Sequence, residues 1–188
     1  MRFALKLCAA AAVFLAAQSG PVQADPNHRI LSQMVGSWFG EGQLEYTKIF
    51  TFPFKCEIQG QPGAVKAQVD LTGRCWYGPL WGRMAAALRY DKRTGSYRGI
   101  FRDATETFII DLKGKRKGQT VKMDLQQGPQ RAAMDVAFEN ANQLQLTIDL
   151  IDPATQGKRQ VIDLTLNRLA ERTAALDIKP QPKEYSQP

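Results

Sequence analysis

Few side chains in this 188-residue sequence are suited to chemistry: it has three cysteines and one histidine. Cys8 lies in an N-terminal segment that we expect to be removed, which leaves Cys56 and Cys75. An even pair of cysteines in an exported protein usually forms a disulfide. A metal site would require further cysteine or histidine ligands nearby, and the two cysteines of a redox pair more often have the spacing Cys-x-x-Cys. We therefore predict a Cys56–Cys75 disulfide and no metal site.

The single histidine, His28, gives little scope for catalysis. No Ser-His-Asp or Cys-His arrangement can be built unless His28 folds back onto the rest of the chain. Composition does not exclude paired carboxylates for glycoside hydrolysis, but nothing in the sequence singles out such a pair. An enzyme is therefore the least favoured function class, and the sequence implies no cofactor.

Binding is better supported than catalysis, because aromatic, small and basic residues cluster in candidate strands. Residues 75–82 (CWYGPLWG) place three aromatic rings around a Gly-Pro turn, where they would form a ligand mouth or a docking surface, or pack locally on the disulfide. Small residues in 84–90 and 132–137 would leave room inside a barrel, unless other side chains fill the interior. Arg98 and Arg102 share a face with Ile100 and could hold a carboxylate or a phosphate, although a solvated exterior is the ordinary place for an arginine. The expected ligand contacts are Trp76, Tyr77, Trp81, Met84, Ala86, Arg98, Arg102, Phe108, Met134 and Phe138.

The first 24 residues have the features of a secretory signal peptide. Arg2 and Lys6 precede an apolar run from Leu7 to Ala17, and Val22-Gln23-Ala24 provides a small-x-small cleavage site. The apolar run is too short to span a bilayer, and no later run approaches the ~20 apolar residues of a transmembrane helix. We expect cleavage near Ala24 and a periplasmic or secreted protein with no membrane span.

The basic balance of the chain, with 25 Lys+Arg against 18 Asp+Glu, does not by itself indicate nucleic-acid binding. Nucleic-acid binding usually requires a broad basic surface with aromatic side chains on which bases can stack. The densest charge run, residues 113–117 (KGKRK), sits at one turn instead. We interpret it as a solvated hairpin tip and expect no nucleic-acid partner.

The elements that must position these residues are strands. After residue 36, apolar and polar residues alternate with period two, as in 144–150 and 162–166, which indicates antiparallel sheet with one buried face. Turn signals separate these runs, and Ile30 to Val35 have helical spacing. The pattern predicts an all-β fold, an up-and-down antiparallel β-barrel of roughly nine or ten strands with one short N-terminal helix. The expected organisation is a signal peptide (1–24), a barrel domain (25–169) and a flexible C-terminal tail (170–188).

One hairpin conflicts with the predicted disulfide. A plain turn at 60–63 (GQPG) sets Cys56 opposite Ala67 rather than Cys75, with Val65 and Ala67 already in the following strand. The disulfide therefore needs a bend near Gly73 or a different turn.

Residues 36–42 (GSWFGEG), which follow the short helix, resemble the opening of the calycin superfamily, and especially nitrobindin-like and related lipocalin-like domains. The resemblance covers about Asn27 to Leu169 and implies that Trp38 closes the barrel floor with Arg168 packed over it. Strand alternation independently points Arg168 inward, and a cation over an indole ring contributes ~0.5–2 kcal/mol. Because no histidine follows His28, the haem binding of nitrobindin-like proteins does not carry over, and the middle-barrel motif of typical lipocalins is missing.

These observations lead to two function hypotheses. The first is an exported β-barrel that binds a small hydrophobic or amphipathic, lipid-like molecule in its lumen. The alternative is a ligand-free structural or interaction protein of the cell envelope, which contacts an envelope protein through a surface loop or the tail.

Overall fold

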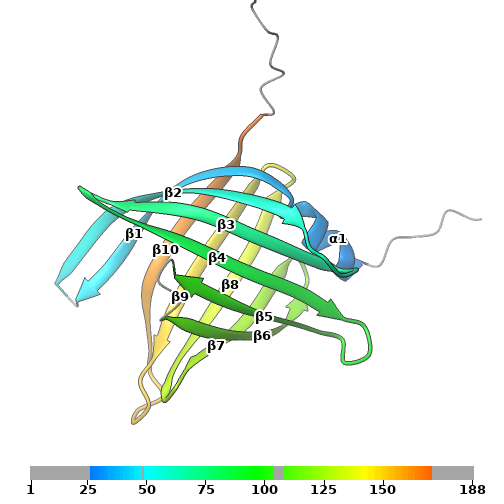
Figure 1. Cartoon of the computed structure of the whole chain (residues 1–188). Helices are drawn as coiled ribbons and strands as arrows, with labels where there is room; N and C mark the ends of the chain where they lie inside the picture. The colour runs from blue at the N-terminus through cyan, green and yellow to red at the C-terminus, as the bar shows by residue number, and fades with distance from the viewer. Residues whose placement is uncertain (1–25, 48, 104–107, 171–188) are drawn as a thin grey trace, which may run out of the picture.

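Ten antiparallel strands close into a barrel in the computed structural model, which describes residues 26–47, 49–103 and 108–170. Each strand pairs with its neighbours in sequence, and β1 pairs with β10 to close the barrel (Figure 1). This up-and-down topology, with one short helix before it, confirms the predicted fold class. The elements are α1 (Pro26–Gln33), β1 (Gly36–Thr47), β2 (Phe50–Pro62), β3 (Gln68–Tyr77), β4 (Leu80–Asp91), β5 (Ser96–Asp103), β6 (Ile109–Lys117), β7 (Thr120–Gln127), β8 (Gln130–Asn140), β9 (Gln143–Ile151) and β10 (Lys158–Arg168).

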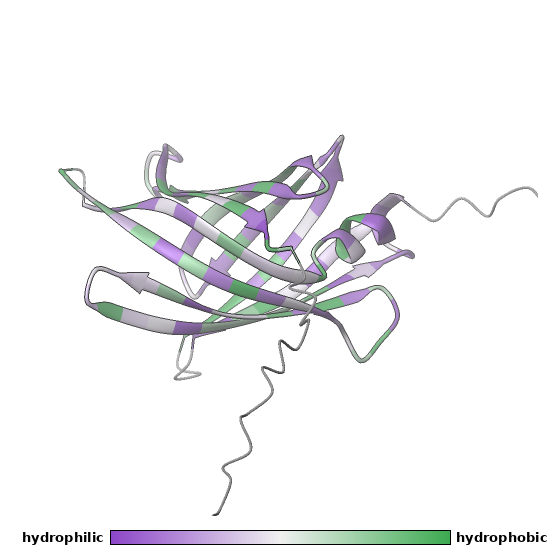
Figure 2. Cartoon of the chain, turned by 90° about the horizontal axis from the view of Figure 1, so that it is seen from above, coloured by the Kyte–Doolittle hydropathy of each residue, from purple (hydrophilic) through white to green (hydrophobic). Residues whose placement is uncertain are grey.

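The period-two pattern explains why these segments form strands. In β7, Val121, Met123 and Leu125 are buried, whereas Lys122 and Asp124 are exposed. Hydrophilic and hydrophobic residues also alternate along other strands (Figure 2). The barrel therefore has an apolar inner face and a solvent-exposed outer face, and closure gives every described strand a neighbour on both sides.

The two ends of the barrel differ. At one, called here the closed end, α1 packs against β3 and β4. At the other, called the open end, lie the connections β1–β2, β3–β4, β5–β6, β7–β8 and β9–β10. In Figure 1, α1 lies at the right, and the tips of the β1–β2 and β3–β4 hairpins reach out at the left.

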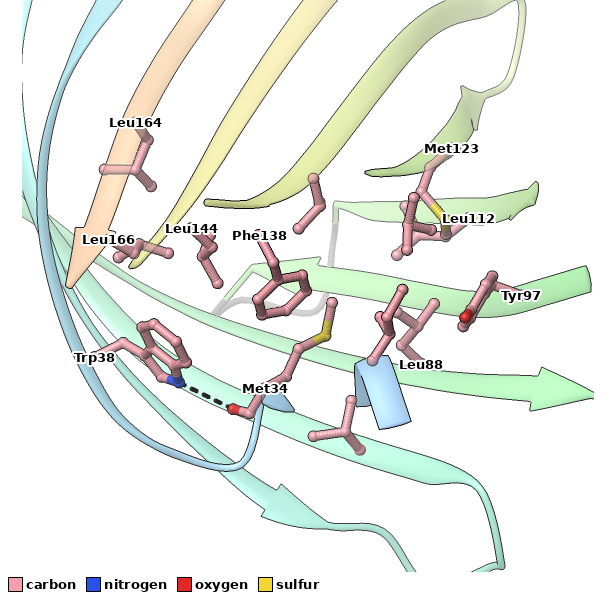
Figure 3. Packing of buried hydrophobic residues seen from close by; sticks show 14 of the residues in the cluster. Met34, Trp38, Leu88, Tyr97, Leu112, Met123, Phe138, Leu144, Leu164 and Leu166 are labelled. Atoms are coloured by element: carbon pink, nitrogen blue, oxygen red, sulfur yellow. Dashed lines mark hydrogen bonds between the residues drawn. The ribbon is translucent and has the colours of Figure 1, made fainter. Parts of the chain in front are cut away.

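The apolar core is concentrated toward the closed end. Ile30 and Leu31 of α1, and Met34 just after it, are buried against inward side chains from the strands. Burying each such side chain is worth about 1.5–3 kcal/mol, so the helix acts as a stabilising plug. Other members of the same buried cluster, labelled in Figure 3, are Trp38, Leu88, Tyr97, Leu112, Met123, Phe138, Leu144 and Leu166.

Hydrogen bonds fix the start of α1 as well. The Asn27 side-chain amide donates to the Tyr90 hydroxyl (2.9 Å), and the fully buried Tyr97 donates its hydroxyl to the Asn27 carbonyl (3.0 Å). Two inward tyrosines of neighbouring strands thus hold the helix across the barrel end.

The disulfide prediction is confirmed, but the predicted turn beside it is wrong. Cys56 and Cys75 are direct partners across β2 and β3, with Cα atoms 4.1 Å apart and a bond between their sulfurs. This register arises because β2 continues through Gly60 to Pro62, so the connection spans residues 63–67. Val65 is therefore exposed in the turn, and Ala67 takes a positive φ of 60° there. No bend at Gly73 is needed.

Two further predictions lie largely outside the described residues: the signal peptide (1–24) and the flexible tail (170–188), of which only Ala170 is described. Within the described ranges, no helix is long and apolar enough to cross a membrane.

Candidate ligand-binding site

The floor of the barrel is built from Trp38 and Arg168, which face each other across β1 and β10. The Arg168 guanidinium carbon lies 4.3 Å from the centroid of the Trp38 ring, and Trp38 is only 2% exposed. The indole nitrogen donates a hydrogen bond to the Met34 carbonyl (3.0 Å), drawn as a dashed line in Figure 3. The ring is thus held from below by the end of the helical segment and covered by the cation.

Arg168 also ties three chain segments together. Its terminal nitrogens donate to the carbonyls of Gln33 and Val35, and its Nε donates to the Ala141 carbonyl (3.2 Å). The last carbonyls of a helix have no partner within the helix, and a cation at a helix C-terminus is favourable. Arg168 therefore covers one face of the Trp38 indole ring and also holds the C-terminal end of α1 in place through hydrogen bonds.

Two glycines make room for this floor. Gly36 has a φ of +119°, and a Cβ there would collide with the Arg168 guanidinium. A Cβ at Gly60 would collide with the Met34 carbonyl oxygen, which accepts the indole hydrogen bond. The sequence needs glycine at these positions because the helical segment and the guanidinium pass directly against the strands.

Above the floor, part of the apolar lining keeps some solvent exposure. A ring of inward apolar side chains around the barrel is only partly buried and packs against the buried core. Apolar walls that can still be reached by solvent are the usual lining of a small-molecule site. The ring consists of Leu44, Ile58, Leu71, Met84, Phe101, Ile110, Met134, Leu146, Ile148 and Ile162.

Polar groups stand at the mouth of this interior. The Tyr77 ring stacks on buried Phe54 with centroids 5.6 Å apart, and burial raises the pKa of the Tyr77 hydroxyl, which therefore stays protonated at neutral pH. Arg159 donates a hydrogen bond to Glu45 (2.7 Å) where β10 and β1 reach the open end. Such groups could meet the polar end of an amphipathic molecule, while the ring above the floor meets its apolar part.

The structure divides the predicted ligand contacts into three groups. Met84, Ala86 and Met134 face the accessible interior, and Phe108 and Tyr77 lie exposed at the open end. Phe138 faces inward but is buried in the closed-end core beside Leu144. The third group, Trp76, Trp81, Arg98 and Arg102, lies on the outer face.

The inward orientation expected for Arg98 and Arg102 is wrong. In β5 the inward positions are taken by Tyr97, which is fully buried, Gly99 and Phe101. Arg98 is consequently exposed outside, between Arg89 and Lys113 of the neighbouring strands. Arg102 is partly buried on the same outer face, and its Nε has no hydrogen-bond partner among the described residues.

The aromatic segment 75–82 also splits between two faces. Cys75 is buried and Tyr77 points to the mouth, so the intervening Trp76 faces outward, where it pairs with Trp81 across the hairpin. The Arg74 guanidinium lies 4.6 Å from the Trp81 ring centroid. These two tryptophans thus belong to an outer surface rather than to the lumen.

A groove of about 590 Å³ lies on the outside of the barrel over β10, β1 and β2. Its charges are already matched within the protein: Lys55 pairs with Glu41 (2.7 Å), and Gln145 donates to Asp163 and accepts from Thr165. The charged groups that line the groove thus already have partners within the protein, although the partner of Asp163 is a neutral amide.

Of the interior ring, the predicted ligand contacts include only Met84 and Met134, and the Glu45–Arg159 pair was not predicted. Alternation was a sufficient signal for the ring residues of β9 and β10, such as Leu146 and Ile162. The Arg159 position had no such signal, because a bulge between Gln160 and Ile162 shifts the register there. In the described part of the chain, no group of three or more His, Cys, Asp or Glu side chains could hold a metal ion.

No protein-family model matches the chain, and no curated protein sequence matches it. Solved structures with a similar fold do match the chain. Rv2717c from M. tuberculosis is 17% identical, the match covers 78% of this chain and 99% of that one, and the TM-score is 0.59. The S-type phycobiliprotein lyase CpeS from Guillardia theta is 11% identical, with 77% and 93% coverage and a TM-score of 0.54. At these identities the likeness shows the fold alone, a ten-strand β-barrel, which is consistent with the calycin resemblance.

Proposed function

We propose that this protein is exported and binds a small apolar or amphipathic, lipid-like molecule in the open part of its barrel. The observation that carries the proposal is the ring of partly exposed apolar side chains above the Trp38–Arg168 floor. Moving each ligand CH₂ group from water onto such a wall is worth ~0.8 kcal/mol. The similar barrel of the phycobiliprotein lyase CpeS supports a role for this fold in binding small molecules.

The ring favours an apolar body over a charged one. None of its members is ionisable, and within the described residues the charged groups near it, such as Glu45 and Arg159, lie at the mouth. A buried charge without a partner costs far more than a buried methylene contributes. The ligand class is therefore an acyl chain or another apolar group with its polar end directed toward the mouth.

Two neighbouring alanines of β4 provide a matched test. Ala86 faces inward between Leu71 and Phe101, whereas Ala87 faces outward between Asp70 and Ile100. Ala86→Phe fills the interior, and we expect it to weaken binding of a fluorescent fatty acid by at least about tenfold, which is 1.4 kcal/mol. Ala87→Phe adds the same ring outside and should leave the affinity unchanged. Equal affinities for both variants, or no saturable binding by the wild type, would refute the interior site.

Native mass spectrometry of protein exported from its own host tests two further parts of the proposal. We expect a chain that begins near Asp25 and carries a lipid-sized adduct. A chain that retains residues 1–24 would refute export by signal-peptide cleavage. An empty barrel that is not stabilised by any lipid of a panel would instead favour the role as an interaction protein of the envelope.

A further inference from the structure

Exposed large apolar side chains gather at the open end of the barrel. Among the described residues, only Val65 and Leu169 of this class lie toward the closed end. The densest group is on two hairpins: Tyr46, Ile49, Phe50 and Phe52 of β1–β2, and Leu80 and Trp81 of β3–β4. Ile49 is 85% exposed and Leu80 is 71% exposed. An apolar patch of this kind marks an interaction site.

The two hairpins are neighbours in the barrel wall. β2 pairs with β3, and Lys55 of β2 is the direct partner of Trp76 of β3. Both tips extend in the same direction from the barrel, at the left of Figure 1. The tip of β1–β2 carries an aromatic cluster, since Phe52 stacks on Phe50 and meets the edge of Tyr46, with ring centroids 6.2 and 6.3 Å apart.

Cations stand directly behind these apolar tips. Arg74 and Arg83 are cross-strand partners, and their guanidinium groups lie 4.6 and 5.7 Å from the centroid of the Trp81 ring. No acidic residue occurs between Asp70 and Asp91, which covers nearly all of the β3–β4 hairpin, or between Glu45 and Glu57 on β1–β2. Glu57 lies opposite Arg74 in register, but the Arg74 guanidinium lies over Trp81, which is nearer the tip.

This arrangement, with apolar side chains at the tips and arginines behind them, matches a lipid surface better than a protein partner. A lipid surface presents anionic phosphate groups outside and hydrocarbon beneath, which complements apolar tips backed by arginines. Tryptophan and tyrosine prefer the boundary between the two layers. A protein partner that adds a strand to a sheet needs a long free edge, whereas each described strand pairs on both sides and leaves only short unpaired stretches, such as residues 50–54 of β2.

We propose that the tips of the β1–β2 and β3–β4 hairpins dock the open end of the barrel on a membrane surface that contains anionic lipids. The docked mouth faces the bilayer, and the closed end with α1 faces away from it. The docking surface is separate from the interior ring, so it holds whether or not the barrel carries a ligand.

Sedimentation with vesicles tests the apolar tips. Wild-type protein should cosediment with phosphatidylcholine vesicles that contain phosphatidylglycerol, and only weakly with phosphatidylcholine alone. Ile49→Ser with Leu80→Ser should reduce the partition coefficient at least about fivefold. The control, Val65→Ser with Leu169→Ser, removes two exposed apolar side chains, 52% and 48% exposed, from the closed end and should have no effect. The variants share residues 1–25, so that segment cannot produce the difference.

A second pair of variants tests the cations. Arg74→Gln with Arg83→Gln should weaken binding to the anionic vesicles about tenfold or more, because each arginine near such a surface contributes on the order of a fivefold factor. Arg89→Gln with Arg98→Gln is the control, since these exposed residues are also cross-strand partners but lie toward the closed end. Circular dichroism and melting temperature verify that each variant is folded.

Three results would overturn the proposal: no vesicle binding by the wild type, equal loss in the tip and control variants, or a tip-dependent dimer in sedimentation velocity without vesicle binding. The last result would assign the surface to a second copy of the chain. Ala86→Phe should still bind vesicles, so failure of the interior site and failure of the docking surface can be told apart.

Discussion

Loss of the Arg168 side chain should destabilise the barrel more than loss of an arginine that lies exposed on the outer face. The guanidinium covers Trp38 and donates to the carbonyls of Gln33, Val35 and Ala141. Two of the three hydrogen bonds are partly buried, at ~1–1.5 kcal/mol each, and the ring contact adds ~0.5–1 kcal/mol. We therefore expect Arg168→Ala to cost about 3 kcal/mol, since the exposed bond to Ala141 adds little.

The assay is chemical unfolding of the disulfide-bonded protein, followed by circular dichroism at a strand wavelength. For a domain of this size, about 3 kcal/mol corresponds to a fall in the melting temperature of roughly 6–12 °C. Arg168→Lys keeps the charge but loses the planar fork, so we expect a loss of about 1–2 kcal/mol. Hydrogen exchange should show the α1 amides opening first, because they lose the C-terminal anchor.

Arg98→Ala is the matched control. Arg98 is exposed outside between Arg89 and Lys113, so its removal should change stability by less than about 0.5 kcal/mol. A cost below about 1 kcal/mol for Arg168→Ala, with α1 still protected from exchange, would refute the assignment of Arg168 as the floor anchor.

Three other predictions follow from the same geometry. Cys56→Ser with Cys75→Ser should cost about 3 kcal/mol in unfolding experiments, because the bond closes a loop with a sequence separation of 19; reductant should then have no further effect on the variant. Gly60→Ala should cost about 1–3 kcal/mol, because its Cβ meets the Met34 carbonyl, whereas Gly82→Ala, with open space around it, should stay within about 0.5 kcal/mol. A hydrogen bond from the Arg93 backbone N–H lowers the pKa of the Asp91 carboxyl group. The ionised carboxylate therefore stabilises the fold at pH values above the ordinary aspartate pKa, and this stabilisation is lost as the pH falls through the lowered pKa. An NMR titration of Asp91 with a midpoint at or above the ordinary aspartate value would contradict this prediction.

Most of the strands could be predicted because their two faces differ strongly in polarity. Residues 144–150 and 162–166 alternate without interruption, and the structure places their apolar members inside the barrel. The failures arise where glycine occupies an inward position. In β5, the inward Gly99 left Ile100 as a misleading guide to the buried face, although the two aromatic residues Tyr97 and Phe101 marked it correctly.

The error at the β2–β3 turn has a related cause. Gly60-Gln61-Pro62-Gly63 has the composition of a turn. Gly60 nevertheless lies within β2, where the absence of a side chain lets the Met34 carbonyl pack directly against the strand. Local composition cannot distinguish a glycine needed for backbone freedom from one needed for close approach. The Cys56–Cys75 disulfide could have predicted the position of the turn, because only a turn centred beyond Pro62 brings these two residues opposite each other.

The arrangement of the floor explains how one end of the barrel can stay open. A ten-strand barrel has more interior than inward side chains alone fill at every level, so the stabilising contacts have to be concentrated somewhere. Here α1, Trp38 and Arg168 concentrate them at the closed end, while Cys56–Cys75 crosslinks β2 and β3 nearer the open end. Several inward residues nearer the mouth can therefore remain only partly buried, although Phe54 is buried there. The barrel thus stays folded with a ring of partly exposed apolar side chains inside and exposed apolar hairpin tips beyond it.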